Sequence, residues 1–78
     1  MSRIIRIYWD FRGPDAAETA KHHLRHLEEF IAKEEIPLYG RGIAKNNEDF
    51  HSAFIEIKED KVEPVRDALK PQRAFVVE

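Results

Sequence analysis

The chain has 78 residues, of which 42% are hydrophobic and 36% are charged, and its formal net charge is −2. This length accommodates one hydrophobic core, so we expect residues 1–78 to form a single domain. No apolar run approaches the roughly 18 residues of a membrane helix, and no basic-then-apolar leader opens the chain. We therefore expect a soluble, cytoplasmic protein without a membrane partner. The lack of cysteine excludes disulfides, thiolate metal sites and thiol nucleophiles.

Residues 3–11 alternate between apolar and polar side chains. One side carries Ile5, Ile7, Trp9 and Phe11, and the other carries Ile4, Arg6, Tyr8 and Asp10. A period of two residues is typical of a β-strand with one buried face, so the pattern predicts a first strand here.

A helix is predicted to follow Gly13-Pro14. Asp15 and Glu18 have the spacing of a capping box, in which each side chain accepts from a free amide at the start of a helix. The apolar residues recur every three or four positions: Ala16, Ala17, Ala20, Leu24, Leu27 and Ile31, with Phe30 at the edge of the stripe. Since a residue before proline avoids helical geometry, Pro37 indicates that the helix ends near residues 33–35.

Two further strands are predicted around a turn. Residues 38–44 form a weaker strand, because Gly40 and Gly42 provide no side chain to pack, and this suits a sheet edge or a bulge. Residues 46–49 have the composition of a turn. Residues 51–57 alternate again and predict a strand with one buried face.

A second, shorter helix is predicted after this strand. Asp60 and Glu63 repeat the capping-box spacing, and Pro64 is tolerated in a first turn whose amides lack helical partners. The apolar stripe consists of Val62, Val65 and Leu69. The helix should end before Pro71, and residues 74–77 should form the last strand.

The predicted element order is β-α-β-β-α-β. This order is that of the ferredoxin-like, α+β arrangement, in which a four-stranded antiparallel sheet of order 4-1-3-2 carries two helices on one face. The other face is expected to be open to solvent.

A register between the two central strands follows from charge and hydrophobicity. If Tyr8 lies opposite Phe54, then Arg6 lies opposite Glu56, and Ile4 lies opposite Lys58. The same register pairs Asp10 with Ser52 on the open face, and Ile5 and Ile7 with Ile57 and Ile55 on the helix side. We therefore predict an Arg6–Glu56 contact beside a Tyr8–Phe54 pair. The candidate binding surface is the open face with Ile4, Arg6, Tyr8, Phe54 and Glu56.

Two short segments resemble a family of RNA-recognition modules. Ile7-Tyr8-Trp9 is similar to the aromatic core of that family's first-strand motif, and residues 53–57 are similar to the second half of its third-strand motif. Phe50 and His51 replace the family's basic residue and glycine, and Ser52 replaces its other stacking aromatic. The resemblance implies single-stranded RNA as a partner, with Tyr8 and Phe54 as the stacking platform. The acidic balance of the chain argues against nucleic acid.

The histidines and the acidic residues suggest two further candidate sites. His22 and His26 lie one helical turn apart and could bind a metal together, although zinc sites need three or four protein ligands. The expected topology gathers a second group at one end of the sheet, where it could bind a small acidic ligand: Asp10, Arg12, His23 and His51.

The sequence favours a small binding or interaction module rather than an enzyme. No residue is assigned as catalytic, because no nucleophile with its base, phosphate loop or dinucleotide motif is present. No cofactor is expected. We expect self-association into a homodimer, through the open sheet face or the glycine-containing edge strand, since a small domain without disulfides gains stability in this way.

Overall fold

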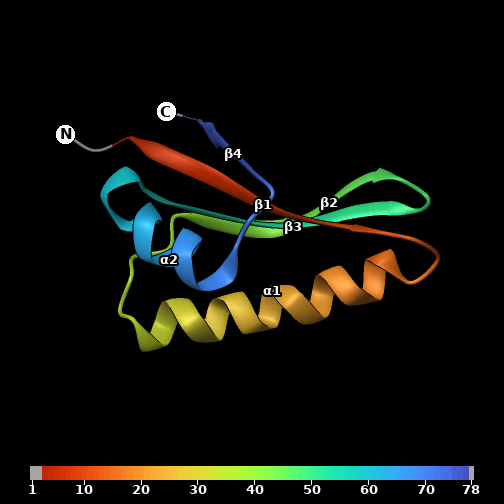
Figure 1. The fold of residues 1–78 in the computed structure, drawn as a ribbon, viewed down its shortest axis with the longest axis horizontal. Helices are drawn as coiled ribbons and strands as arrows, with labels where there is room; N and C mark the ends of the chain where they lie inside the picture. The colour runs from red at the N-terminus through yellow and green to blue at the C-terminus, as the bar shows by residue number, and fades with distance from the viewer. Residues whose placement is uncertain (1–2, 78) are drawn as a thin grey trace.

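The computed structural model describes residues 3–77, which form four strands and two helices. In chain order these are β1 (Ile4–Arg12), α1 (Ala16–Lys33), β2 (Gly40–Asn47), β3 (Phe50–Lys58), the 3₁₀ turn η1 (Glu59–Lys61), α2 (Val62–Leu69) and β4 (Arg73–Val76). The strands form one sheet of order β2-β3-β1-β4, and both helices lie on the same side of it (Figure 1). The fold is therefore the predicted ferredoxin-like α+β arrangement.

The register of the two central strands is the predicted one. Tyr8 pairs with Phe54 and Arg6 pairs with Glu56 in the antiparallel β1–β3 ladder. The other predicted pairs of this ladder, from Ile4–Lys58 to Asp10–Ser52, are present as well. Since a shift by one residue would exchange the two faces of each strand, this register determines which side chains face the helices.

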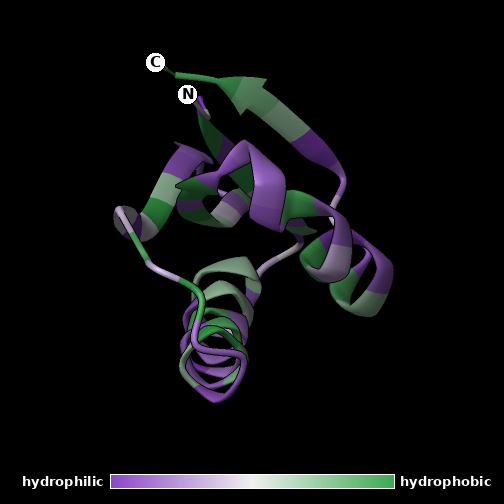
Figure 2. Ribbon diagram, turned by 90° about the vertical axis from the view of Figure 1, so that its left-hand side faces the viewer, coloured by the Kyte–Doolittle hydropathy of each residue, from purple (hydrophilic) through white to green (hydrophobic). Residues whose placement is uncertain are grey.

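The core lies between the sheet and the helices, where alternate residues of β1 and β3 meet the apolar stripe of α1. Its largest fully buried aliphatic side chains are Ile7, Leu27, Ile55, Ile57 and Val65. Trp9 is also buried, and its indole Nε1–H donates to the Leu69 carbonyl at 2.8 Å. This bond ties β1 to the last residue of α2. In contrast, β4 runs along the sheet edge, away from α1 (Figure 2).

Neither predicted capping box forms. Asp15 is the N-cap of α1, but its side chain makes no capping bond, because its backbone (φ −99°, ψ 13°) is not in the extended conformation that a capping residue adopts. Its carbonyl instead accepts from the amide and the hydroxyl of Thr19, both at 3.0 Å. Asp60 lies inside η1, so Lys61 is the N-cap of α2.

The edge strands differ from the prediction at their ends. β2 begins at Gly40 and extends to Asn47, which leaves only two residues for the turn to β3. The irregularity in the pairing of β2 lies between Lys45 and Asn47 and not at the glycines. The side-chain amide of the intervening Asn46 donates to the Ser52 hydroxyl at 3.0 Å. β4 is displaced by one residue, to Arg73–Val76.

Candidate nucleic-acid interface

The open face of the sheet collects side chains from β1, β3 and β4. Alternation along the paired strands places these residues on it: Arg6, Tyr8, Asp10, Arg12, Phe50, Ser52, Phe54, Glu56, Arg73 and Phe75. We refer to this set as the open-face platform. Sequence analysis identified the central pairs of this platform but not Phe50, Arg73 and Phe75. Phe50 preceded the predicted third strand, and the predicted strand order did not give the register of β4 against β1.

Tyr8 lies at the centre of the aromatic part of this platform. Its ring centroid is 5.8 Å from that of Phe54 and also 5.8 Å from that of Phe75. The predicted Tyr8–Phe54 pair is therefore present, and β4 extends it by a third ring. Phe75 is 51% exposed, so this row of rings offers aromatic surface to a ligand.

Guanidinium groups lie between and over these rings. Arg6 lies 4.9 Å from the centroid of Phe54, and Arg73 lies 4.4 Å from that of Tyr8. Arg12 stacks on Phe50 at 3.9 Å. Cation–π contacts of this kind hold the planar guanidinium groups on the ring surfaces.

Each acidic side chain of the platform is paired with an arginine. Glu56 accepts from Arg6 Nε at 2.7 Å, which confirms the predicted cross-strand contact. The pKa of Arg6 is raised by its hydrogen bond to the Tyr8 hydroxyl and, to a smaller extent, by its bond to Glu56. Asp10 accepts from Arg73 at 2.7 Å and from Ser52 at 2.6 Å. Burial alone would raise the pKa of Asp10, but the bonds from Arg73 and Ser52 outweigh it, so the pKa lies below its ordinary value.

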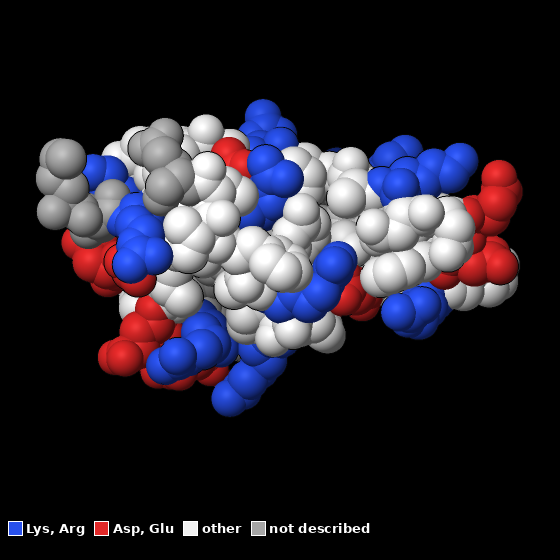
Figure 3. All heavy atoms as spheres, turned by 90° about the horizontal axis from the view of Figure 1, so that it is seen from above, with Lys and Arg blue, Asp and Glu red and all other residues white. Residues whose placement is uncertain are grey.

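The open face is positively charged although the chain as a whole is negative. The same alternation places Lys58 on this face, so its cations are Arg6, Arg12, Lys58 and Arg73, against Asp10 and Glu56. Within residues 3–77, Arg12 and Lys58 form no ion pair. Figure 3 looks onto this face and shows Lys and Arg side chains along its length, with most acidic side chains at its margins. Composition alone could not reveal this separation of charge between two faces.

The two glycines of β2 allow side chains of β3 to lie across that strand. A Cβ at position 42 would lie 2.9 Å from the Phe54 ring, and one at position 40 would lie 2.9 Å from Glu56 Cδ. Both distances are too short for real contacts, so a side chain at either position would displace the Phe54 ring or the Glu56 carboxylate. The sequence had suggested a sheet edge or a bulge for this strand; β2 is an edge strand, and its irregularity lies after Lys45 and not at the glycines.

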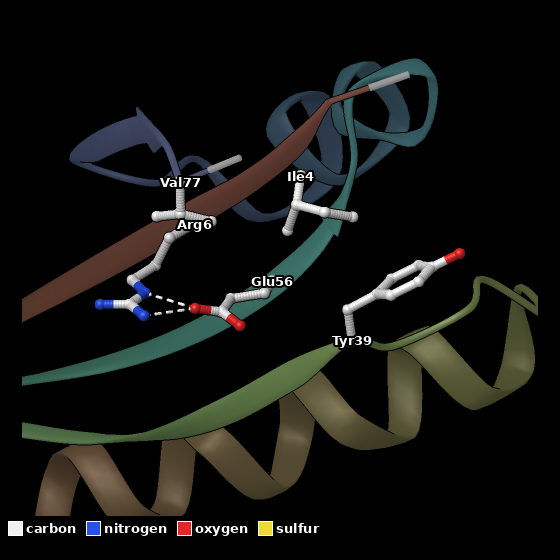
Figure 4. A pocket seen from close by; sticks show the side chains of 5 residues that line it. All are labelled: Ile4, Arg6, Tyr39, Glu56 and Val77. Carbon is white, nitrogen blue, oxygen red and sulfur yellow. Dashed lines mark hydrogen bonds and ion pairs between the residues drawn. The ribbon is translucent and has the colours of Figure 1, made fainter. Parts of the chain in front are cut away.

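A pocket opens beside the Arg6–Glu56 pair (Figure 4). It has a volume of about 350 Å³ and is lined by Ile4, Arg6, Tyr39, Glu56 and Val77. Tyr39 precedes β2 and is fixed by its backbone amide, which donates to the Glu56 carbonyl at 2.8 Å. Sequence analysis did not identify Tyr39, because the residue lies outside any strand with a clear alternation.

The predicted ligand group at the end of the sheet is divided between its two faces. Asp10 and Arg12 belong to the open-face platform, whereas His23 and His51 lie on the helix side. His23 is half-buried, with its ring centroid 5.3 Å from that of Phe11. Burial, and to a smaller extent the charge of His26, lowers the pKa of His23. The four residues therefore do not share one face of the sheet.

The two candidate metal ligands on α1 lie side by side at the surface. The ring centroids of His22 and His26 are 6.3 Å apart, and both side chains are exposed. Nδ1 of His26 also lies 3.5 Å from the Glu29 carboxylate. In the described part of the chain, no group of three or more histidine or acidic side chains is placed to hold a metal ion.

Comparison with protein-family models, with curated proteins and with solved structures found no match. Among residues 3–77, no helix combines the length and the apolar character needed to cross a bilayer.

Proposed function

We propose that this protein is a non-enzymatic binding module that takes single-stranded nucleic acid on its open-face platform. The observation that carries the proposal is the row formed by Phe54, Tyr8 and Phe75, with Arg6 and Arg73 stacked on its rings. Bases stack on aromatic rings whatever their identity, and cationic side chains beside the rings attract the phosphates.

The charge distribution supports the same ligand. The carboxylates of Asp10 and Glu56 are engaged by arginines, so they repel a phosphate backbone less than free carboxylates would. Arg12 and Lys58 lie toward opposite ends of the central strands, and we expect them to contact phosphates on either side of the aromatic row. The net negative charge of the chain arises on other surfaces and is compatible with a local basic face.

Binding can be tested with two arginine variants that change the net charge equally. Arg12 stacks on Phe50 on the open face, whereas Arg25 is an exposed residue of α1. In fluorescence anisotropy with a labelled single-stranded RNA, Arg12→Ala should weaken binding several-fold and lower the slope of log K against log salt by about 0.7, the value for one lost phosphate contact. Arg25→Ala should bind like the wild type. Equal effects of the two variants, or no binding at low salt, would refute the proposal.

The stacking contribution can be tested at the most exposed ring of the row. Phe75→Ala removes a side chain that is 51% exposed and should change stability little. Loss of one stacked base costs about 1–3 kcal/mol, which corresponds to roughly 5- to 150-fold weaker binding. An unchanged affinity for this variant, with its fold verified by circular dichroism, would exclude Phe75 from the interface.

A second candidate function, self-association, is favoured by one feature of the β4 edge. Phe75, Val76 and Val77 are 51%, 52% and 44% exposed, and residues 74–77 contain neither charge nor proline. Sheet edges without such protection pair with other strands. The β2 edge carries Arg41, Lys45 and the irregularity after Lys45, all of which hinder pairing. A two-fold dimer through the open face would bring like charges together.

Sedimentation at micromolar concentrations tests this second candidate. A dimer formed through the β4 edge should dissociate in Val76→Lys, which places a charge on the edge strand, whereas Lys45→Ala on the opposite edge should leave it intact. A wild-type protein that is monomeric at all concentrations would exclude edge pairing while leaving the nucleic-acid proposal to be judged by the binding assays.

A further inference from the structure

The pocket beside the open-face platform combines a carboxylate, a guanidinium group and an exposed aromatic ring. We propose that it receives a guanine base of the bound strand, an inference that rests on the proposed function. Figure 4 shows Tyr39 at one side of the pocket, with Arg6 and Glu56 facing each other and Ile4 and Val77 above them. The volume of about 350 Å³ lies within the range of small-molecule pockets.

The carboxylate of Glu56 has one oxygen available for a ligand. Both nitrogens that Arg6 directs at it, Nε and Nη2, contact Oε2. Oε1 lies over Gly40, where the absence of a side chain leaves room for it, and no donor within residues 3–77 occupies it. A carboxylate oxygen accepts hydrogen bonds only, so this position of the pocket selects a group that donates.

Guanine presents two adjacent donors, N1–H and the N2 amino group, with the acceptor O6 beside them. Because these two donors are adjacent, the single free oxygen Oε1 can accept from both of them, while a second N–H of an Arg6 terminal nitrogen donates to O6. Adenine and cytosine place an acceptor nitrogen beside their amino group, and uracil flanks its single N–H with two carbonyls. Each of these bases can therefore give Oε1 one hydrogen bond at most, where guanine gives two, and it places an acceptor beside that bond.

Tyr39 provides a surface for the face of the base. Tyr39 is 51% exposed, and its backbone is held to β3 by the bond from its amide to the Glu56 carbonyl. The backbone of Tyr39 is therefore attached to the same residue of β3 that carries the carboxylate. A base that stacks on Tyr39 can reach Glu56 with its edge, which combines stacking with hydrogen-bond selection, as single-stranded RNA readers do.

The test uses short uridine strands that contain one central guanosine, inosine or adenosine. The wild type should bind the guanosine strand roughly 5- to 150-fold more tightly than the all-uridine strand, the range for one good bidentate base contact. Inosine lacks the N2 amino group and should lose much of this preference. The adenosine strand should bind like uridine alone.

Glu56→Gln provides the second arm, with Glu29→Gln on the exposed face of α1 as the control of equal charge change. Loss of the Glu56 charge should abolish the guanosine preference and, because Arg6 loses its counter-charge, should strengthen binding of the all-uridine strand at low salt. Glu29→Gln should retain the preference. Equal binding of all strands by the wild type, or an unchanged preference in Glu56→Gln, would overturn the guanine assignment alone. Absence of binding to every strand would overturn the proposed function as well.

Discussion

The Glu56 side chain of β3 lies across the backbone of Gly40 in the neighbouring strand, and a Cβ on Gly40 would lie 2.9 Å from Glu56 Cδ and still closer to Oε1. The position of this carboxylate, and with it the Arg6–Glu56 pair, therefore depends on a glycine in a different strand. Since a carboxylate is the far end of a flexible side chain, it would move before the backbone does.

Gly40→Ala is expected to displace Glu56 and to weaken its bond to Arg6. In a Glu56→Ala background the collision is absent, and Gly40→Ala should stabilise the protein by about 0.4–1 kcal/mol, through the lower entropy of the unfolded chain. In the wild type the same gain is opposed by the weakened, partly exposed pair, so the gain should be smaller by about 0.2–1 kcal/mol. Urea unfolding of the four proteins measures this difference between the two backgrounds. Equal effects of Gly40→Ala in both backgrounds would contradict the proposed collision.

Trp9→Phe is expected to destabilise the protein by about 1–3 kcal/mol. The variant leaves the Leu69 carbonyl at the end of α2 without its donor and removes part of a buried ring. Because Trp9 is the single tryptophan, far-ultraviolet circular dichroism is the suitable probe of unfolding. Ile5→Val, a smaller change in the same strand, should cost about 0.5–1.5 kcal/mol and serves as the control. A smaller loss for Trp9→Phe than for the control would argue against this bond as a link between β1 and α2.

Asp10→Asn is expected to reduce stability at neutral pH and to lose this effect in acid. The pKa of Asp10 is lower in the folded protein than in the unfolded chain, so its contribution is complete above the ordinary aspartate value and is lost as the pH falls through the folded value. At pH 7 the variant should lose about 1–3 kcal/mol, since Arg73 and Ser52 lose a charged acceptor. Unfolding curves at pH 7 and pH 2.5 measure the difference. Asp67→Asn, at an exposed position of α2, is the control. Its difference in unfolding free energy from the wild type should be the same at pH 7 and pH 2.5.

Strand alternation and charge were sufficient to predict the element order and the β1–β3 register. Each alternating segment has one apolar side, and only one register placed Arg6 opposite Glu56 while closing the apolar side. The helix ends near Pro37 and Pro71 were also predictable, since proline restricts the residue before it. These features depend on neighbours in the sequence or on a single pair of strands.

The parts that sequence analysis missed depend on contacts between strands, which the pattern of a single strand does not show. Phe75 joins Tyr8 and Phe54 only because β4 pairs with β1 in one register, and β4 is too short for alternation to indicate it. The close approach at Gly40 and Gly42 arises from side chains of β3 and is not visible in the β2 sequence. The capping boxes failed for a different reason, because the spacing of Asp15 and Glu18 was correct but the backbone at Asp15 was not extended.

His23 is expected to make the protein less stable as the pH falls from neutral. Burial against Trp9 and Phe11 lowers the pKa of His23 in the folded state, so the unfolded chain binds a proton first. The unfolding free energy should therefore be highest above the ordinary histidine pKa of about 6.5. It should decrease as the pH falls below this value, until the pH lies below the pKa of His23 in the folded protein.

The variant that tests this effect is His23→Leu, which retains an apolar side chain at the same place and removes the titrating group. Urea unfolding at pH 7.5 and pH 5.5 should show a smaller decrease in unfolding free energy for His23→Leu than for the wild type. His22→Leu removes a histidine from the exposed side of the same helix and should retain the wild-type decrease. If His23→Leu and His22→Leu lost stability equally between these two pH values, the acid sensitivity would have to arise from a group other than the half-buried His23.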